Sequence, residues 1–232
     1  MSFPVIFKHL FGALLKKNMN KIKIVILDFD GTLGDTTGVI IKTTQGTIAE
    51  LGLPSRTDEQ CAAMIGLRLV EIPPVLFPGY EIDVDLYAQT YRRLFHKFNT
   101  DGAVDLYPNV LETLAELKNR GIVLTIASSR SNSSLTDFIR NLHLEDTITY
   151  VLGGNDVKEG KPKPEAVNMT LAKYGFKPEE AIVVGDTVFD VHMGINAGTR
   201  TCAVTYGNGT KESLADATWL IDDFGQLLEI VK

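Results

Sequence analysis

Two aspartates, Asp28 and Asp30, follow an apolar run in the segment "ILDFDGTLGDT" at residues 26–36. Carboxylates this close to each other at the end of a buried strand repel unless a cation or a proton offsets their charge. The spacing also resembles the start of a calcium-binding EF-hand loop. That loop needs a preceding helix and a glutamate at its twelfth position, whereas here a strand is predicted and the position holds Val39. The pair therefore indicates cation or acid–base chemistry at a strand end.

Three further segments place polar side chains directly after apolar runs or loops. They contribute Ser128 and Ser129 in "GIVLTIASS", Lys161 in "GKPKPE", and Asp186 and Asp190 in "GDTVFD". Asp186 and Asp190 are four residues apart, which predicts that both carboxylates lie on one face of the first turn of a helix. Helix capping by Asp186 is the alternative interpretation of that motif on its own.

The charges of these residues indicate what the site binds. Four carboxylates at one sheet edge require cations, and Lys161 supplies only one positive charge. A divalent cation and a protonated Asp30 would allow a phosphate dianion to bind, with backbone amides and helix N-termini stabilising the remaining negative charge. Ligands that are all oxygen favour Mg²⁺ over zinc, because the motifs contain no cysteine and the nearby His192 is expected to face elsewhere.

Short apolar runs rich in valine and isoleucine predict buried parallel strands, and amphipathic segments lie between them. The predicted strands are 23–28, 121–129, 181–186 and 199–207, and helices are predicted over 109–121 and 163–175, each ending at a glycine. Strands that alternate with helices predict an α/β fold, a doubly wound Rossmann-like parallel sheet. The carboxyl ends of such strands are where ligands bind.

The alternation stops between residues 38 and 104, where the sequence predicts helices over 37–52, 56–66 and 84–99 and no clear strand. An insertion directly after the first strand would lie over the site. The predicted domains are therefore an N-terminal extension (1–22), a core (23–37 and 105–232) and an inserted α-helical cap (38–104).

Composition excludes several classes of function. The net charge is −6 and the pI is about 5.3, with no basic run, so no nucleic-acid partner is expected. Cys61 and Cys202 form no disulfide framework or metal motif, which indicates reduced thiols in the cytoplasm. Residues 1–20 are interrupted by charge and too short to span a bilayer, so no stable membrane insertion is expected. Met19 is a candidate native start, although a surface anchor is the alternative for this segment.

Taken together and in this order, the motifs resemble those of the haloacid dehalogenase-like superfamily of phosphotransferases. "DFDGTLGDT" (28–36) is similar to its first motif, Ser128 in "LTIASS" to its second, Lys161 in "GKPKPE" to its third and "GDTVFD" (185–190) to its fourth. The segment "YPNVLETLAELKNRGI" (107–122) is similar to the phosphoglycolate phosphatase-like branch. The resemblance runs from about residue 23 to the end of the chain and includes a small α-helical cap.

The resemblance implies a role for each matching residue. Asp28 would be the nucleophile that forms an aspartyl-phosphate, and Asp30 would protonate the leaving oxygen and later activate water. Ser128 would donate a hydrogen bond to the phosphoryl group, and Lys161 would bring positive charge to the phosphate and to Asp28. Mg²⁺ would be held by Asp28, the backbone carbonyl of Asp30 and Asp186. Asp190 would orient Lys161 or a metal-bound water, and Thr32 belongs with it among the supporting residues.

Other residues carry weaker signals. Ser129 and Arg130 follow the second motif and are candidate substrate contacts, as is Arg68 in the cap, with a solvated surface arginine as the alternative for each arginine. The cap residues at 91–93, 96 and 97 are expected to be mostly solvated or packed. The glycines of "YGNGT" (206–210) lack the context of a dinucleotide site.

These expectations favour a magnesium-dependent phosphatase that hydrolyses a small phosphorylated metabolite of the phosphoglycolate or sugar-phosphate type. Asp30 argues against carbon–halogen cleavage, because that leaving group needs no proton and the dehalogenases lack an aspartate at this position. One alternative is a β-phosphoglucomutase-like phosphotransferase, which uses the same core residues. A second alternative is a non-enzymatic regulator that binds a phosphorylated ligand.

Overall fold

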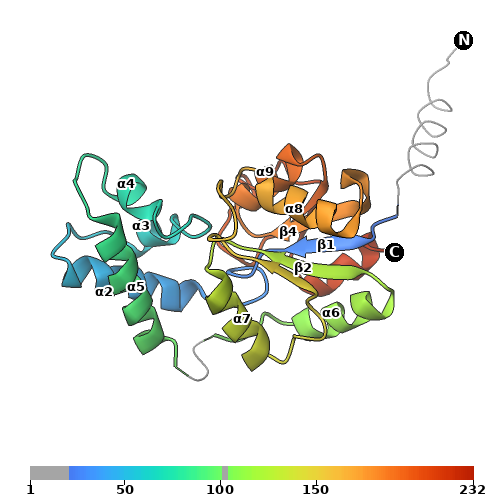
Figure 1. Ribbon diagram of the computed structural model, residues 1–232, viewed down its shortest axis with the longest axis horizontal. Helices are drawn as coiled ribbons and strands as arrows, with labels where there is room; N and C mark the ends of the chain where they lie inside the picture. The colour runs from blue at the N-terminus through green and yellow to red at the C-terminus, as the bar shows by residue number, and fades with distance from the viewer. Residues whose placement is uncertain (1–20, 101–103) are drawn as a thin grey trace, which may run out of the picture.

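A six-stranded parallel sheet forms the centre of the computed structural model, which describes residues 21–100 and 104–232 (Figure 1). The strand order is β3-β2-β1-β4-β5-β6. The strands are β1 (Ile24–Leu27), β2 (Val123–Ala127), β3 (Tyr150–Leu152), β4 (Ala181–Gly185), β5 (Arg200–Val204) and β6 (Trp219–Ile221). The order reverses between β1 and β4, so a binding crevice is expected at their carboxyl ends.

Strand β1 is central because its side chains are apolar on both faces. All four of its residues are fully buried. Val25 and Leu27 belong to the hydrophobic cluster on one face, and Ile24 and Ile26 belong to the cluster on the other. Leu27 is opposite both Ile126 of β2 and Val184 of β4, so the three strands end nearly level. Their following residues therefore meet at one edge.

Helices cover the two faces of the sheet. On one face lie α6 (Val110–Asn119), α7 (Asn132–Asn141) and the short α10 (Leu227–Ile230), whereas α8 (Glu165–Tyr174) and α9 (Val188–Asn196) lie on the other (Figure 1). Two single 3-10 turns, η1 (Pro178–Glu180) and η2 (Phe224–Gln226), also belong to this part of the chain. The predicted doubly wound α/β fold is confirmed.

The sequence predicted four of the six strands, each one to four residues too long. The missing strands, β3 and β6, have three residues each and are only partly buried. A run of three residues has no periodicity to detect, and their position is fixed by pairing with β2 and β5. The ends of helices α6 and α8 agree with the predicted stops, because Gly121 and Gly175 follow them with positive φ.

The segment between β1 and α6 forms four helices beyond the carboxyl end of the sheet (Figure 1). They are α2 (Thr37–Glu50), α3 (Asp58–Ala62), α4 (Ile72–Leu76) and α5 (Val84–Phe98). They enclose a hydrophobic cluster of their own, which includes Ile48, Phe77 and Tyr87. The predicted helix over 56–66 is wrong in length, since only α3 is helical and turns follow it.

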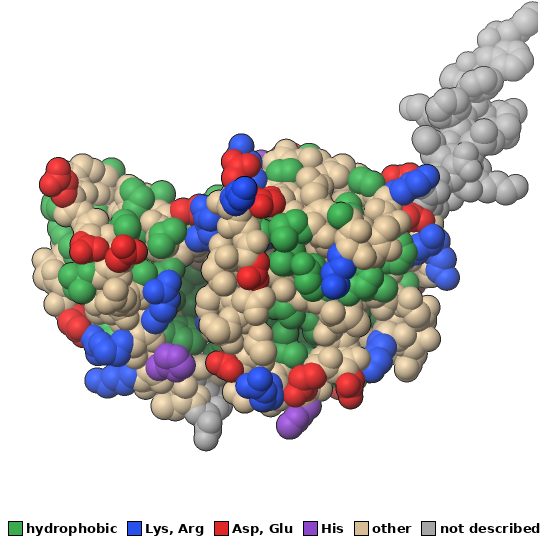
Figure 2. All heavy atoms as spheres, in the orientation of Figure 1, with side chains coloured by type: hydrophobic (Ala, Val, Ile, Leu, Met, Phe, Trp, Pro, Cys, Tyr) green, Lys and Arg blue, Asp and Glu red, His purple; other side chains and the backbone are tan. Residues whose placement is uncertain are grey.

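A hollow separates the α2–α5 helices from the sheet layer, and hydrophobic side chains are visible in it (Figure 2).

The domain limits at 38–104 and 105–232 stay a prediction. Residues 1–20, on which the expectations about Met19 and the N-terminal extension depend, lie outside the described residues. Among the helices of residues 21–100 and 104–232, none has both the length and the hydropathy needed to cross a bilayer.

Candidate active site

Asp28 lies at the centre of the site, directly after β1. Its backbone N–H donates to the carbonyl of Val184 in β4 (2.8 Å), which extends the sheet pairing by one residue. The residue is buried, with 4% of its surface exposed. This position at the strand-order reversal places the carboxylate at the edge where a doubly wound sheet binds ligands.

Lys161 bridges two buried carboxylates. Its Nζ donates to Asp28 Oδ1 and to Asp190 Oδ1, each at 2.5 Å, and all three side chains are at most 5% exposed. Burial acts to lower the pKa of Lys161, but the charges of Asp190 and Asp28 outweigh it and raise the pKa above its ordinary value. The ammonium group is therefore held in its charged form.

Asp186 follows β4, and its carboxylate is held by three donors. Asn208 donates from its backbone N–H and from its Nδ2 to Oδ2, both at 2.8 Å, and Thr32 Oγ1 donates to Oδ1 at 3.3 Å. The placement of Thr32 beside a predicted metal ligand suits the supporting role that the sequence suggested.

The prediction that Asp186 and Asp190 share the first turn of a helix is wrong. Helix α9 begins at Val188 with Thr187 as its N-cap residue, so Asp186 precedes the helix and does not cap it. Asp190 Oδ2 accepts hydrogen bonds from the backbone N–H and the hydroxyl of Thr187. The two carboxylates still meet, because the strand end and the helix start point to the same place.

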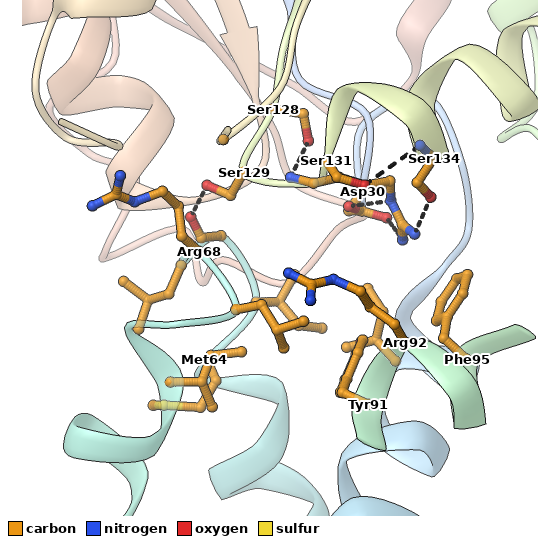
Figure 3. A pocket seen from close by; sticks show the side chains of 18 of the residues that line it. Asp30, Met64, Arg68, Tyr91, Arg92, Phe95, Ser128, Ser129, Ser131 and Ser134 are labelled. Carbon is orange, nitrogen blue, oxygen red and sulfur yellow. Dashed lines mark hydrogen bonds and ion pairs between the residues drawn. The ribbon is translucent and has the colours of Figure 1, made fainter. Parts of the chain in front are cut away.

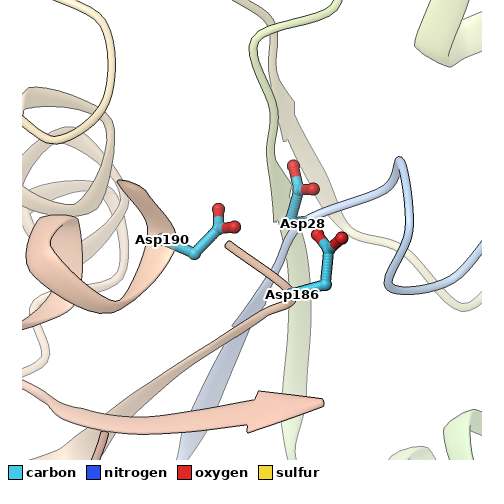
Figure 4. Close-up of side chains that lie close together, drawn as sticks. All are labelled: Asp28, Asp186 and Asp190. Atoms are coloured by element: carbon cyan, nitrogen blue, oxygen red, sulfur yellow. The ribbon is translucent and has the colours of Figure 1, made fainter. Parts of the chain in front are cut away.

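Three carboxylates form a group that could hold a cation (Figure 4). Asp28, Asp186 and Asp190 each offer an oxygen atom, and these atoms lie within 4.8 Å of one another. Burial raises the pKa of Asp28 well above its usual range against the opposing charge of Lys161, and the neighbouring aspartates add to the rise. Burial and the charge of Asp190 likewise raise the pKa of Asp186. The group as it stands carries more negative charge than Lys161 offsets.

Asp30 lies apart from this group, in an ion pair with Arg130. Its two oxygens accept from Arg130 Nη2 (2.6 Å) and Nε (3.1 Å). The guanidinium packs over the rings of Phe95 and Phe138, 4.6 and 5.1 Å from their centres. The alternative of a surface arginine is wrong for Arg130, because its side chain is only 10% exposed.

The other predicted residues lie around the same space. Ser128 is buried next to the cavity and accepts a hydrogen bond from the backbone N–H of Arg130 (3.4 Å). The Ser129 hydroxyl instead donates to the carbonyl of Gly66 in the inserted segment (2.5 Å). Arg68 pairs with Glu71 and donates to the carbonyl of Lys158 (3.0 Å), so it is not a freely solvated arginine.

A cavity of about 400 Å³ lies between the sheet edge and the inserted helices (Figure 3). Asp28, Asp30 and Ser128 line one side of it, and Met64, Tyr91 and other largely apolar side chains of the inserted segment line the opposite side. This size is within the range of small-molecule sites.

Sequence reasoning missed two features. Asn208 was dismissed with the "YGNGT" segment, yet its amide holds Asp186. The signal was a glycine-flanked asparagine directly after a predicted strand. Tyr91 and Arg92 of α5 are packed and exposed respectively, as expected, but both also line the cavity, which the sequence did not indicate. Helical periodicity spreads side chains over several faces and does not tell which face meets the core.

Comparison with known proteins identifies the family. Residues 25–204 match the family described as haloacid dehalogenase-like hydrolase. A phosphoglycolate phosphatase of Photorhabdus laumondii is 28% identical over 226 residues, which cover 94% of this chain and 96% of that protein. The pyrophosphatase PpaX of Bacillus pumilus is 32% identical over 197 residues, which cover 85% and 89%.

Solved structures show the same fold. A haloacid dehalogenase-like hydrolase from Bacteroides fragilis superposes with a TM-score of 0.83 at 28% identity, covering 89% of this chain and all of that one. CbbY from Rhodobacter sphaeroides superposes with a TM-score of 0.78 at 22% identity, over 89% and 96% of the two chains. With the family match spanning most of its length, this chain belongs to the haloacid dehalogenase-like hydrolases.

Proposed function

We propose that this hydrolase is a Mg²⁺-dependent phosphatase that cleaves small phosphorylated metabolites of the phosphoglycolate or sugar-phosphate type through an aspartyl-phosphate on Asp28. The observation that carries the proposal is the buried arrangement of Asp28, Lys161, Asp186 and Asp190 at the strand-order reversal. The relatives named phosphoglycolate phosphatase and pyrophosphatase support phosphoryl transfer to water.

The donor set fits Mg²⁺. The carboxylates of Asp28, Asp186 and Asp190 are buried and close, they repel each other, and all of their donor atoms are oxygen, which suits a small hard cation. Asp28, the backbone carbonyl of Asp30 and Asp186 would hold the ion, while Asp190 stays with Lys161. Bound Mg²⁺ supplies positive charge that offsets the carboxylates and the phosphate.

The residues of the chain divide the reaction between them. An oxygen of Asp28 attacks phosphorus, the bond from phosphorus to the leaving oxygen breaks, and Asp30 gives that oxygen a proton. Asp30 then takes a proton from the water that cleaves the aspartyl-phosphate, which restores Asp28 and releases phosphate. Ser128 and Lys161 hold the phosphoryl oxygens by hydrogen bonding and charge. Asp30 must leave Arg130 before it can transfer a proton.

We also propose that residues 38–104 act as a cap over a core of residues 23–37 and 105–232. The cavity between the two parts, with the phosphoryl-transfer residues on the core side, supports this division. Closure of the cap would keep bulk water away from the reacting groups while the aspartyl-phosphate forms.

A phosphate-release screen tests the proposal. The purified chain is incubated with p-nitrophenyl phosphate, 2-phosphoglycolate, pyrophosphate, sugar phosphates and nucleotides, with Mg²⁺ or with EDTA. We expect phosphate release to need Mg²⁺ and to be lost in Asp28→Asn. The control Asp146→Asn removes an exposed carboxylate and should keep full activity. Equal activity in Asp28→Asn would refute the nucleophile.

Two other results of the same screen would overturn the proposal. Conversion of a hexose 1-phosphate to the 6-phosphate in the presence of a bisphosphate, without phosphate release, would show a phosphotransferase that moves the group within a sugar. Lack of release from every compound by the wild-type protein would favour a regulator that only binds phosphorylated ligands.

A further inference from the structure

Three arginines line the cavity, and their partners differ. Arg68 forms an ion pair with Glu71, and Arg130 forms one with Asp30. Arg92 of α5 has no hydrogen bond, ion pair or ring contact with any residue in the described parts of the chain. Two of the three guanidinium groups are therefore already neutralised, whereas the charge of Arg92 is not.

The unpaired side chain extends into the cavity. Figure 3 shows the guanidinium of Arg92 between the lining side chains of α5 and the loop that carries Ser129. The neighbouring Arg93 is also exposed, as Arg92 is, but it pairs with Glu50. Successive residues of a helix are about 100° apart, so the two arginines point to different sides of α5. Of these two, only Arg92 lines the cavity.

Apolar side chains share the cavity lining with Arg92. Met64, Leu67, Tyr91 and Phe95 line the cavity near the inserted helices. If the proposed cap closes over an anion at Arg92, the ion pair would form partly among these apolar side chains and gain more than one in open water. A guanidinium also matches a carboxylate or a phosphate with two parallel hydrogen bonds. The cavity thus has a phosphoryl-transfer wall at Asp28 and a second anion-binding group on the opposite side.

Resting on the proposed function, we infer that Arg92 determines substrate specificity by binding a second anionic group on the leaving part of the substrate. The substrate class is then a phosphate ester or anhydride whose leaving group is itself an anion, either a carboxylate or a second phosphate. The phosphoryl group would lie at Asp28 and the second anion at Arg92. A neutral leaving group would leave the Arg92 charge unpaired in the closed cavity.

Matched variants and matched substrates test the inference. Arg92→Gln and Arg93→Gln each remove one charge from α5 and keep a polar side chain. The substrates are 2-phosphoglycolate, pyrophosphate and 2-hydroxyethyl phosphate, which end in a carboxylate, a phosphate and a neutral hydroxyl. Arg92→Gln is expected to lower kcat/KM about 10- to 100-fold for whichever anionic substrate is used, as loss of a charged hydrogen bond would. Its kcat/KM for 2-hydroxyethyl phosphate, and all values for Arg93→Gln, stay within about twofold of wild type.

Each other result overturns the inference. An equal loss on the neutral and anionic substrates would show a structural role for Arg92, and no loss on the anionic ones would show no role. Wild-type preference for 2-hydroxyethyl phosphate would refute the substrate class while leaving the phosphatase intact. Release from none of the three substrates, nor from p-nitrophenyl phosphate, would remove the proposed function itself.

Discussion

Lys161 is held between Asp28 and Asp190 with almost no exposure to solvent. A buried cation between two carboxylates is costly to break, because removal of one partner leaves charges without compensation. The same side chain is well placed to approach a phosphoryl group on Asp28. Its structural and its proposed chemical roles therefore coincide.

We predict that Lys161→Gln lowers the free energy of unfolding by about 3–5 kcal/mol, because Asp28 and Asp190 lose their buried partner. Lys23→Gln is the control, since Lys23 pairs with Glu180 at the surface with half of its side chain exposed. That change is expected to cost less than about 1 kcal/mol. Urea denaturation measures both, and equal losses would contradict the account.

A second prediction concerns pH and follows from Asp28 and Asp186. Burial raises the folded-state pKa of both above the ordinary aspartate value of 3.8. The folded chain then keeps protons that the unfolded chain releases, so stability falls as the pH rises above about 4. Lys161 does not oppose this trend, because its raised pKa keeps its contribution intact below 10.5. In EDTA, the Tm is expected to fall between pH 5 and pH 8.

Mg²⁺ should reverse this loss. Cation binding needs ionised carboxylates, so MgCl₂ is expected to raise the Tm more at pH 8 than at pH 5. Asp186→Asn removes one proposed ligand and should reduce the magnesium-dependent part of the rise. A Tm that does not respond to Mg²⁺ at pH 8 would argue against a cation site at these carboxylates.

At the residue scale, the sequence placed Asp28, Lys161, Asp186 and Asp190 at one edge, and the structure brings them together. That was possible for Asp28 and Asp186 because each directly follows a recognisable strand, whereas Lys161 and Asp190 were placed by the order and spacing of their motifs. The ion pair of Arg130 with Asp30 was not predictable, because the two residues are 100 positions apart and belong to different loops. Contacts of this kind depend on loop geometry rather than on periodicity.

At the scale of elements, the loop after β1 is the part most constrained by the site. Gly31 has a φ of +79°, and a Cβ at this position would lie 2.1 Å from Asp186 Oδ2. The loop thus passes directly against a proposed metal ligand. Any side chain there must displace either the loop or the carboxylate.

We therefore predict that Gly31→Ala is much more harmful than Gly121→Ala. Gly121 has a similar φ of +77°, but no atom lies within 4 Å of the added carbon. Its substitution should cost about 1–2 kcal/mol for the left-handed backbone. Gly31→Ala adds the clash, about 1–3 kcal/mol more, and should also weaken Mg²⁺-dependent stabilisation. Urea denaturation with and without Mg²⁺ measures both effects. Equal losses of unfolding free energy in the two variants would contradict the proposed contact between the loop at Gly31 and Asp186.

The elements themselves were predictable to different degrees. Buried strands of four or five residues, such as β1 and β4, have continuous apolar runs that identify them. Helix α4 was not predicted, because Pro73 and Pro74 interrupt any helical pattern in a segment of five residues. Its position is fixed instead by Ile72 and Leu76, which pack with Phe77 and Tyr87 in the cluster of the inserted helices.

At the scale of the whole molecule, the proposed function requires both the sheet edge and the inserted helices. The sheet edge supplies the carboxylates, Ser128 and Lys161, and the inserted helices supply the opposite wall of the cavity. Hydrogen bonds from Ser129 to Gly66 and from Arg68 to Lys158 connect the inserted helices to the loops beside the sheet edge. The sequence indicated an insertion over the site, but not which of its side chains face the cavity, because that depends on how α5 is rotated against the core.

The most direct test of the central claim is to trap the enzyme during turnover. The wild-type chain is mixed with substrate and Mg²⁺, quenched in acid, reduced with borohydride to mark any acyl phosphate, and mapped by peptide mass spectrometry. We predict modification at Asp28 in the wild type and none in Asp28→Asn. Modification of a different residue, or an unmodified chain while phosphate is being released, would contradict it.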